Sequence, residues 1–203
     1  MISDSDAIRN EVINFCSVIG ADPMLVQGAG GNISWKDGNT LWVKASGTWL
    51  SDSKVDNIFV PVELDHLQSA IKEGNFSIIP KVIGRSILRP SIETLLHALL
   101  DFRVVVHVHA IEALTLLVRN DPIEEISKKL KNNIPWVLVD YKKPGFDLAR
   151  AISNKINDNL GVQIIFLQNH GIVIGGSNVS EVNNILFNLV KPSIRENPNS
   201  SNI

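Results

Sequence analysis

The sequence predicts a layered α/β domain in which helices flank a sheet, and three observations carry this prediction. Short apolar runs of strand length, such as residues 103–109 and 163–168, are rich in β-branched side chains. Longer segments between them repeat their apolar residues at helical spacing. Residues 33–44 read as a β-hairpin that turns at Asp37-Gly38, so hairpins are mixed with helices. This mixture favours a layered sheet over a pure array of β-α-β units.

The first half of the chain begins with a helical pattern and a glycine. Ile8, Val12, Phe15 and Ile19 share one face of a helix that Gly20 closes. Ser91 is expected to cap a later helix that turns its leucines inward. The expected elements are a helix at 5–19, a short strand at 24–26, the hairpin, a strand at 59–62, and helices at 63–73 and 91–100.

The second half alternates more regularly between strands and helices. Leu148, Ile152 and Ile156 lie four residues apart, which indicates a helix. We expect strands at 103–109, 137–141, 163–168 and 172–174, and helices at 110–118, 121–131, 146–158 and 179–190. Residues 1–192 are expected to form one domain, which is long enough to bury a core. The polar residues 193–203 are expected to form a disordered tail.

Composition excludes several classes of partner. The formal net charge is −2 and no basic block occurs, so we expect no nucleic-acid partner. The apolar runs are too short for a bilayer, and the acidic N-terminus does not resemble a signal peptide. Cys16 is the single cysteine, so no disulfide framework is expected and a cytoplasmic location is favoured.

Three histidines form the most informative pattern. His107 and His109 lie two apart on a strand and therefore share a face, and His170 follows a second strand within Gln-Asn-His-Gly. Together they supply three ligands of a tetrahedral metal site whose fourth position stays open for water or substrate. Zinc suits this set, and iron, cobalt or manganese would also bind. The alternative is three unrelated core histidines.

Glu93 is the candidate acid or base beside this metal. It lies near the start of the expected helix at 91–100, where first-turn acids also occur for helix stability alone. The functional interpretation is a general acid/base close to a metal. His97 lies one turn further along, either as a partner that orients Glu93 or as a packed helix residue.

Two glycine-containing segments are candidate anion sites. Gly28-Ala-Gly30-Gly31-Asn32 lacks the lysine of a P-loop, yet its backbone amides could hold an anion. Lys44-Ala-Ser46-Gly47-Thr48 offers a cation, hydroxyls and an exposed amide. Ordinary turn chemistry is the alternative for both segments.

These segments together resemble the class II aldolase/adducin head-domain family. The matching segments cover residues 8–190 and most resemble the aldolase half of bifunctional rhamnulose-phosphate aldolase/alcohol dehydrogenases. They are Gly-Ala-Gly-Gly-Asn-Ile-Ser at 28–34, Lys-Ala-Ser-Gly-Thr at 44–48, Arg-Pro-Ser-Ile-Glu-Thr at 89–94, His-Val-His at 107–109, Tyr-Lys-Lys-Pro-Gly at 141–145 and Gln-Asn-His-Gly at 168–171.

The resemblance implies a three-layer α/β/α sandwich with a mostly antiparallel sheet, in a homo-oligomer for which a tetramer is favoured. It implies zinc at the histidines matching His107, His109 and His170. It also implies that Glu93 acts as acid/base and is a possible ligand in the empty site. The groups it implies for substrate phosphate are Gly31, Asn32, Ser46, Gly47 and Ser91.

The function implied is aldol cleavage or formation of a sugar phosphate or related hydroxyketone through an enediolate. The same metal site also serves epimerases, decarboxylases and dehydratases of the family, and adducin-like modules are not catalytic. Two positions depart from the pattern. Ile92 stands where phosphate-using aldolases often carry a serine, and Tyr141 does not match the tyrosine that donates a proton to the aldehyde.

Overall fold

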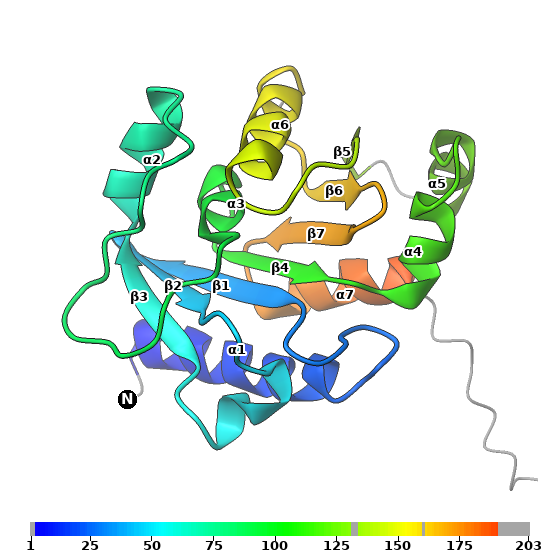
Figure 1. Cartoon of the computed structure of the whole chain (residues 1–203). Coiled ribbons are helices and arrows are strands. Elements are labelled where there is room, and N and C mark those ends of the chain that lie inside the picture. Colours follow the sequence, from blue (N-terminus) through cyan, green and yellow to red (C-terminus); the bar gives the residue numbers. More distant parts are fainter. Residues whose placement is uncertain (1–2, 131–133, 160, 191–203) are drawn as a thin grey trace, which may run out of the picture.

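A computed structural model of the chain describes residues 3–130, 134–159 and 161–190. Its centre is a seven-stranded sheet with helices on both faces, so the expected three-layer α/β/α sandwich is confirmed (Figure 1). In spatial order the strands are β3 (Phe59–Glu63), β2 (Thr40–Lys44), β1 (Asn32–Asp37), β4 (Val104–Val108), β7 (Gly171–Gly176), β6 (Ile164–Leu167) and β5 (Trp136–Val139).

The sheet is mostly antiparallel, as expected. Among the described strands only β5 and β6 pair in parallel, and the other neighbouring pairs are antiparallel. The register places His107 of β4 between Asn32 of β1 and Val173 of β7. Directly paired residues point to the same side of a sheet, so these three side chains share one face.

Helices cover the two faces unequally. Helices α1 (Asp4–Gly20) and α7 (Val179–Leu189) lie below the sheet in Figure 1, and α2 (Leu64–Lys72), α3 (Thr94–Leu99) and α6 (Phe146–Asn157) lie above it. Helices α4 (Ile111–Leu117) and α5 (Ile123–Lys129) stand at one end of the sheet. A short 3-10 helix, η1 (Leu50–Lys54), packs against α1. No helix among the described residues is both long and apolar enough to span a bilayer.

The ends of α1 show how local sequence sets an element. The hydroxyl of Ser3 accepts a hydrogen bond from the Asp6 backbone amide, and Asp4 and Asp6 occupy the first turn, where the helix dipole favours acids. At the other end, a Cβ on Gly20 would lie 2.4 Å from the backbone nitrogen of Ser51. Only glycine therefore allows η1 to approach the helix so closely.

Two expectations in the first half of the chain, the strand at 24–26 and the position of the hairpin turn, were wrong in detail. Residues 24–26 are no strand, because the amides of Leu25 and Val26 both donate to the Asp22 carbonyl, which folds the segment into a turn. The hairpin exists, but Asp37 pairs with Thr40, so its two loop residues are Gly38 and Asn39. Gly38 has a φ of +55°, the conformation that a tight hairpin turn requires.

The helix expected at 91–100 starts later than the sequence suggested. The Ser91 hydroxyl accepts from the Glu93 amide, and the Ser91 carbonyl accepts from the Thr94 amide, so residues 91–93 form a turn. Helix α3 begins at Thr94, and Glu93 rather than Ser91 holds the N-cap position, without a capping side-chain bond. The other expected helices and strands are present within a few residues, whereas the tail at 193–203 lies outside the described residues.

Candidate functional site

Three histidines from two distant segments meet where β4 ends and β7 begins. His107 is the fourth residue of β4, His109 follows that strand, and His170 belongs to the turn that connects β6 with β7. Because β4 and β7 run antiparallel, with Val108 paired to Ile172, the end of one strand lies beside the start of the other. The strand geometry expected from the sequence therefore brings together the side chains it singled out.

The imidazoles are close enough to share one ion. Their candidate ligand nitrogens all lie within 4.8 Å of one another. The Nε2 atoms of His107 and His109 are 3.2 Å apart, close to the ~3.3 Å that separates two nitrogens of a tetrahedral zinc site with bonds of ~2.0–2.1 Å. The most distant of these nitrogens are farther apart than ~3.3 Å, so the three imidazoles do not all have the spacing of a bound zinc site.

A backbone hydrogen bond fixes the orientation of His107. Its Nδ1 donates to the Ile172 carbonyl at 3.0 Å, which leaves the Nε2 lone pair directed at the other histidines. The neighbouring strand can approach because residue 171 is glycine. A Cβ there would lie 2.5 Å from the Val108 carbonyl oxygen and 3.2 Å from His107 Cε1.

Glu93 faces two of the three imidazoles. Its Oε2 lies 3.6 Å from His107 Nε2, and its Oε1 lies 3.5 Å from His170 Nε2. Asn32 donates its side-chain amide to Ser91 Oγ at 2.6 Å and to Glu93 Oε2 at 3.3 Å. The carboxylate is thus positioned on one side, while its Oε1 has no hydrogen-bond partner among the described residues.

The environment keeps the imidazoles neutral. Burial lowers the pKa of His107 to about 4, and the bond to Ile172 opposes this only in part. Burial, followed by the proximity of His107, also lowers the pKa of His109 and of His170 to about 4. Near pH 7 all three rings are therefore uncharged, which is the form that binds a metal.

These residues fit a divalent metal ion on chemical grounds. Three neutral imidazoles converge, one carboxylate oxygen is buried without a hydrogen bond, and the Nδ1 of His170 is also unpartnered among the described residues. Buried polar atoms normally find partners, so an unpartnered carboxylate oxygen that faces these imidazoles indicates a group that binds there. Imidazole with carboxylate is the donor set that zinc, iron, cobalt and manganese accept.

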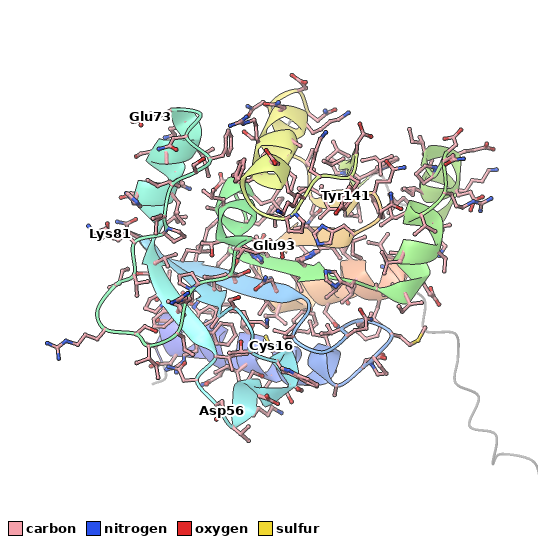
Figure 2. The ribbon with its side chains drawn as sticks, in the orientation of Figure 1. Cys16, Asp56, Glu73, Lys81, Glu93 and Tyr141 are labelled. Atoms are coloured by element: carbon pink, nitrogen blue, oxygen red, sulfur yellow. The ribbon has the colours of Figure 1, made fainter. Side chains whose placement is uncertain are left out.

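A cavity of about 250 Å³ connects the histidines with both candidate anion segments. It is bordered by His109, His170 and Glu93 at one end and by the two glycine-containing segments elsewhere. All the phosphate-site residues expected from the resemblance line it, namely Gly31, Asn32, Ser46, Gly47 and Ser91. His107 is fully buried behind this wall. Figure 2 shows Glu93 on the upper side of the sheet, opposite Cys16 of α1.

Lys44 lines the cavity, and the sequence had offered it as the cation of a candidate anion segment. Ile92 and Pro144 also line the cavity, and the sequence had not assigned them as ligand-contacting residues. Lys44 is almost fully buried, its Nζ donates to the Ala29 carbonyl, and burial lowers its pKa to about 8. Its position in the sequence, between Val43 and Ala45 at the end of an apolar strand, is the feature that indicates a buried lysine. His97 is fully buried, and its ring bonds the Ser34 hydroxyl at 2.8 Å rather than the Glu93 carboxylate.

Comparisons with known proteins identify the family to which the chain is similar. The sequence profile described as Class II Aldolase and Adducin N-terminal domain matches residues 10–191. YuxG of Bacillus subtilis (strain 168), named an uncharacterized oxidoreductase, is 30% identical over 82% of this chain, which spans only 26% of that relative's length. The L-fuculose phosphate aldolase of Methanocaldococcus jannaschii is 26% identical, covering 84% of this chain and 85% of that protein.

One solved structure is similar in both sequence and fold. It is the N-terminal class II aldolase domain of a conserved protein from Thermoplasma acidophilum, with a TM-score of 0.76 and 30% sequence identity. The likeness covers 94% of this chain and 92% of that one.

Proposed function

This chain belongs to the class II aldolase and adducin N-terminal domain family, and from that premise we propose that it is a metal-dependent aldehyde-lyase. Its reaction would break or form a carbon–carbon bond in a sugar phosphate or related hydroxyketone. The observation that carries the proposal is the convergence of His107, His109, His170 and Glu93 beside one cavity. A non-catalytic module has no need for such a buried, partly unpartnered set.

The three histidines would hold the metal, with zinc as the favoured ion. When bound, the ion would supply Lewis-acid polarisation of the substrate ketone and its adjacent hydroxyl. The low pKa of the imidazoles supports this role because no proton has to leave before the ion binds near pH 7.

Glu93 would move the proton at the carbon next to the carbonyl. Its carboxylate is held by Asn32 through Oε2, and Oε1 is free to accept a proton. In cleavage the hydroxyl on the carbon that becomes the aldehyde would lose its proton to solvent as the carbon–carbon bond breaks, and protonated Glu93 would give its proton to the carbon of the ketone fragment. In condensation both transfers run in reverse, so Glu93 would take that proton from the carbon. Asn32 and Ser91 orient the carboxylate and, with Gly31, Ser46 and Gly47, offer donors for a substrate phosphate.

Two features favour a second candidate with the same proton chemistry. Among the described residues no tyrosine lines the cavity, so no phenol hydroxyl of this chain is in place to donate to the aldehyde oxygen. Ile92 is 69% exposed and adds an apolar wall instead of a phosphate donor. An epimerase, decarboxylase or dehydratase would use Glu93 and the histidines without releasing an aldehyde.

Product analysis separates these reactions. Zinc-loaded protein would be incubated with L-fuculose 1-phosphate and L-rhamnulose 1-phosphate, with Glu93→Gln protein as control. An aldolase releases dihydroxyacetone phosphate and a 2-hydroxyaldehyde, and the Glu93→Gln protein should not. Carbon dioxide, loss of water or an inverted substrate carbon in place of an aldehyde would contradict the lyase and identify the corresponding alternative.

We also propose that the chain acts as a homo-oligomer, with a tetramer favoured. Three large apolar side chains are exposed: Ile92 lines the cavity, and Trp49 and the fully exposed Ile87 line a second hollow that shares Gly47 with it. Burying such side chains against another copy would be favourable. The molar mass from light scattering tests this, since a monomer of 22.3 kDa would exclude it. We further propose that residues 1–192 form one domain and that the protein is cytoplasmic.

A further inference from the structure

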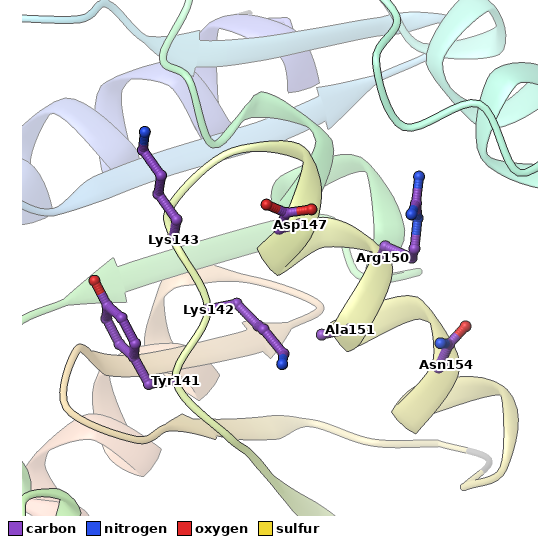
Figure 3. A pocket seen from close by; sticks show the side chains of 7 residues that line it. All are labelled: Tyr141, Lys142, Lys143, Asp147, Arg150, Ala151 and Asn154. Atoms are coloured by element: carbon purple, nitrogen blue, oxygen red, sulfur yellow. The ribbon is translucent and has the colours of Figure 1, made fainter.

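Polar side chains outside the candidate site differ in whether they meet one another. The hollow between α6 and the loop before it is lined by Lys142, Lys143 and Arg150, but their charged ends point in different directions (Figure 3). The guanidinium of Arg150 lies over the ring of Phe76. Nothing brings these cations to one point, so they do not define an anion site.

Two buried polar residues beside the candidate site do meet. Ser34 of β1 is 1% exposed and His97 of α3 is 0% exposed, and the Ser34 hydroxyl is hydrogen-bonded to His97 Nδ1 at 2.8 Å. Burial, followed by the proximity of His107, lowers the pKa of His97 to about 3, so this is a bond between neutral groups near pH 7. The neighbours of His97 in the helix, Leu96 and Ala98, are apolar and equally buried. Burying a polar pair among them costs desolvation free energy that an apolar pair avoids, which indicates a role beyond packing.

The pair is the second of two attachments between β1 and the segment that carries Glu93. Asn32 donates its side-chain amide to Glu93 Oε2, and two residues along the same face of β1, Ser34 meets His97. Glu93 and His97 are one helical turn apart, because the Glu93 carbonyl accepts from the amides of Leu96 and His97. Two residues of a strand span ~6.7 Å and four residues of a helix span ~6 Å, so both attachments form side by side.

One attachment would leave the carboxylate poorly fixed. The bond from Asn32 to Glu93 is 3.3 Å long, beyond the usual range for such a bond. Glu93 makes no capping bond through its side chain, and its Oε1 has no hydrogen-bond partner among the described residues. The place of the carboxylate therefore depends on the backbone of the turn that carries it. The bond between Ser34 and His97 prevents this turn from rotating or sliding along β1.

We propose that Ser34 and His97 are positioning residues, whose hydrogen bond holds the first turn of α3 against β1 and so sets the place of the Glu93 carboxylate beside the three histidines. This inference rests on the proposed role of Glu93 as acid/base. Neither positioning residue is among the described residues that line the cavity, so both act through the backbone that they join. A displacement of about 1 Å at a reacting group can lower a rate by about 10²-fold, which is why such a clasp matters.

The first test separates position from stability by removing one partner or both. Ser34→Ala leaves His97 Nδ1 buried without a partner and should lower the melting temperature by about 2–10 °C. Ser34→Ala/His97→Leu removes both polar groups and should melt within about 4 °C of the wild type. Both proteins should nevertheless lose about tenfold or more in kcat, with KM changed by less than about twofold, because the substrate contacts remain. A merely structural role predicts instead that kcat returns with the melting temperature.

Two conservative variants and a control sharpen this test. The side-chain amide of His97→Asn places a polar atom where Nδ1 lies, whereas that of His97→Gln places it where Nε2 lies. His97→Asn should therefore retain kcat within about threefold of the wild type despite the smaller side chain, and His97→Gln should lose about tenfold. Leu96→Val changes an apolar residue of the same helix and is the matched control, so its kcat should be unchanged.

Crystal structures of the metal-free wild type and double variant test the inference without activity. In Ser34→Ala/His97→Leu we expect the Glu93 carboxylate to shift by about 1 Å or more and to lose its bond from Asn32. If the wild type turns over none of the candidate substrates, the proposed function fails, and this comparison still decides the positioning role. A carboxylate that keeps its wild-type place in the double variant, or a kcat that recovers with the melting temperature, would overturn the proposal.

Discussion

Strand β4 presents two faces of opposite chemistry from one run of residues. Val104, Val106 and Val108 enter the apolar core beneath the sheet, with α1 and α7, whereas Val105 and His107 face the opposite side. The first face is closed by two long helices. On the second, α3 is only six residues long and begins just after Glu93.

The difference shows where this fold can place reactive groups. On the upper face, Asn32, Ser34 and His107 are buried, and their partners Glu93 and His97 come from the turn before α3 and from α3 itself. A short helix leaves space at its N-terminal end for polar side chains that bond one another. On the lower face, the residues of β4 are all apolar and take no part in the proposed reaction. They stabilise the fold instead, because burial of apolar surface is the main favourable term in folding.

The sharpest way to test this contrast is to remove one residue from each face. His107→Ala should lower catalytic activity by about 10⁴-fold, because loss of the bound metal removes several kcal/mol of barrier reduction. Val106→Ala, one residue earlier on the other face, should cost about 1–3 kcal/mol of unfolding free energy and retain activity. Initial rates and urea unfolding measure the pair. Equal loss of activity in both variants would mean that the faces are not functionally distinct.

The next largest effect is expected for Glu93→Gln. The amide cannot accept a proton, so activity should fall by about 10²–10⁴-fold while the histidines still bind the metal. Glu73→Gln, at the exposed end of α2, is the control and should leave the rate unchanged. Loss of metal together with activity in Glu93→Gln would instead make Glu93 a ligand.

Gly171→Ala should disturb the antiparallel pairing of β4 with β7. The new methyl would lie 2.5 Å from the Val108 carbonyl oxygen, so the strands must shift at a cost of about 1–3 kcal/mol, with weaker metal binding. Ile172→Val alters the adjacent residue on the apolar face and should cost about 0.5–1.5 kcal/mol with unchanged metal affinity. Denaturant unfolding and metal titration compare the two. Normal metal affinity in Gly171→Ala would show that the site tolerates a strand shift.

The smallest effect is the pH dependence of the metal-free protein. The folded pKa of each site histidine is about 4, below the usual value of 6.5, so the unfolded chain binds more protons between these limits. Stability should therefore be fully present above pH 6.5 and fall as the pH drops toward 4. His170→Asn should make this slope shallower, as melting temperatures would show. An unchanged slope would mean that the ring of His170 does not contribute to it.

The sequence predicted the layers, most elements and the convergence of the histidines, because strand periodicity fixes which side chains share a face. The prediction from the sequence failed where hydrogen bonds to nearby polar groups determine the backbone conformation. The turn at 23–25 follows from amides that donate to Asp22, and the late start of α3 follows from the Ser91 hydroxyl. Nor could spacing alone show that the two candidate anion segments share one cavity or that Arg150 lies over Phe76, since both arrangements join separate parts of the chain.

The most direct test of the account is the metal content of protein purified without added metal, measured by elemental analysis for the wild type, His107→Ala and Val106→Ala. We expect about one zinc per chain in the wild type and in Val106→Ala, and almost none in His107→Ala. A wild type that contains no metal and takes up none on soaking, or a His107→Ala protein that keeps its full share, would contradict the account.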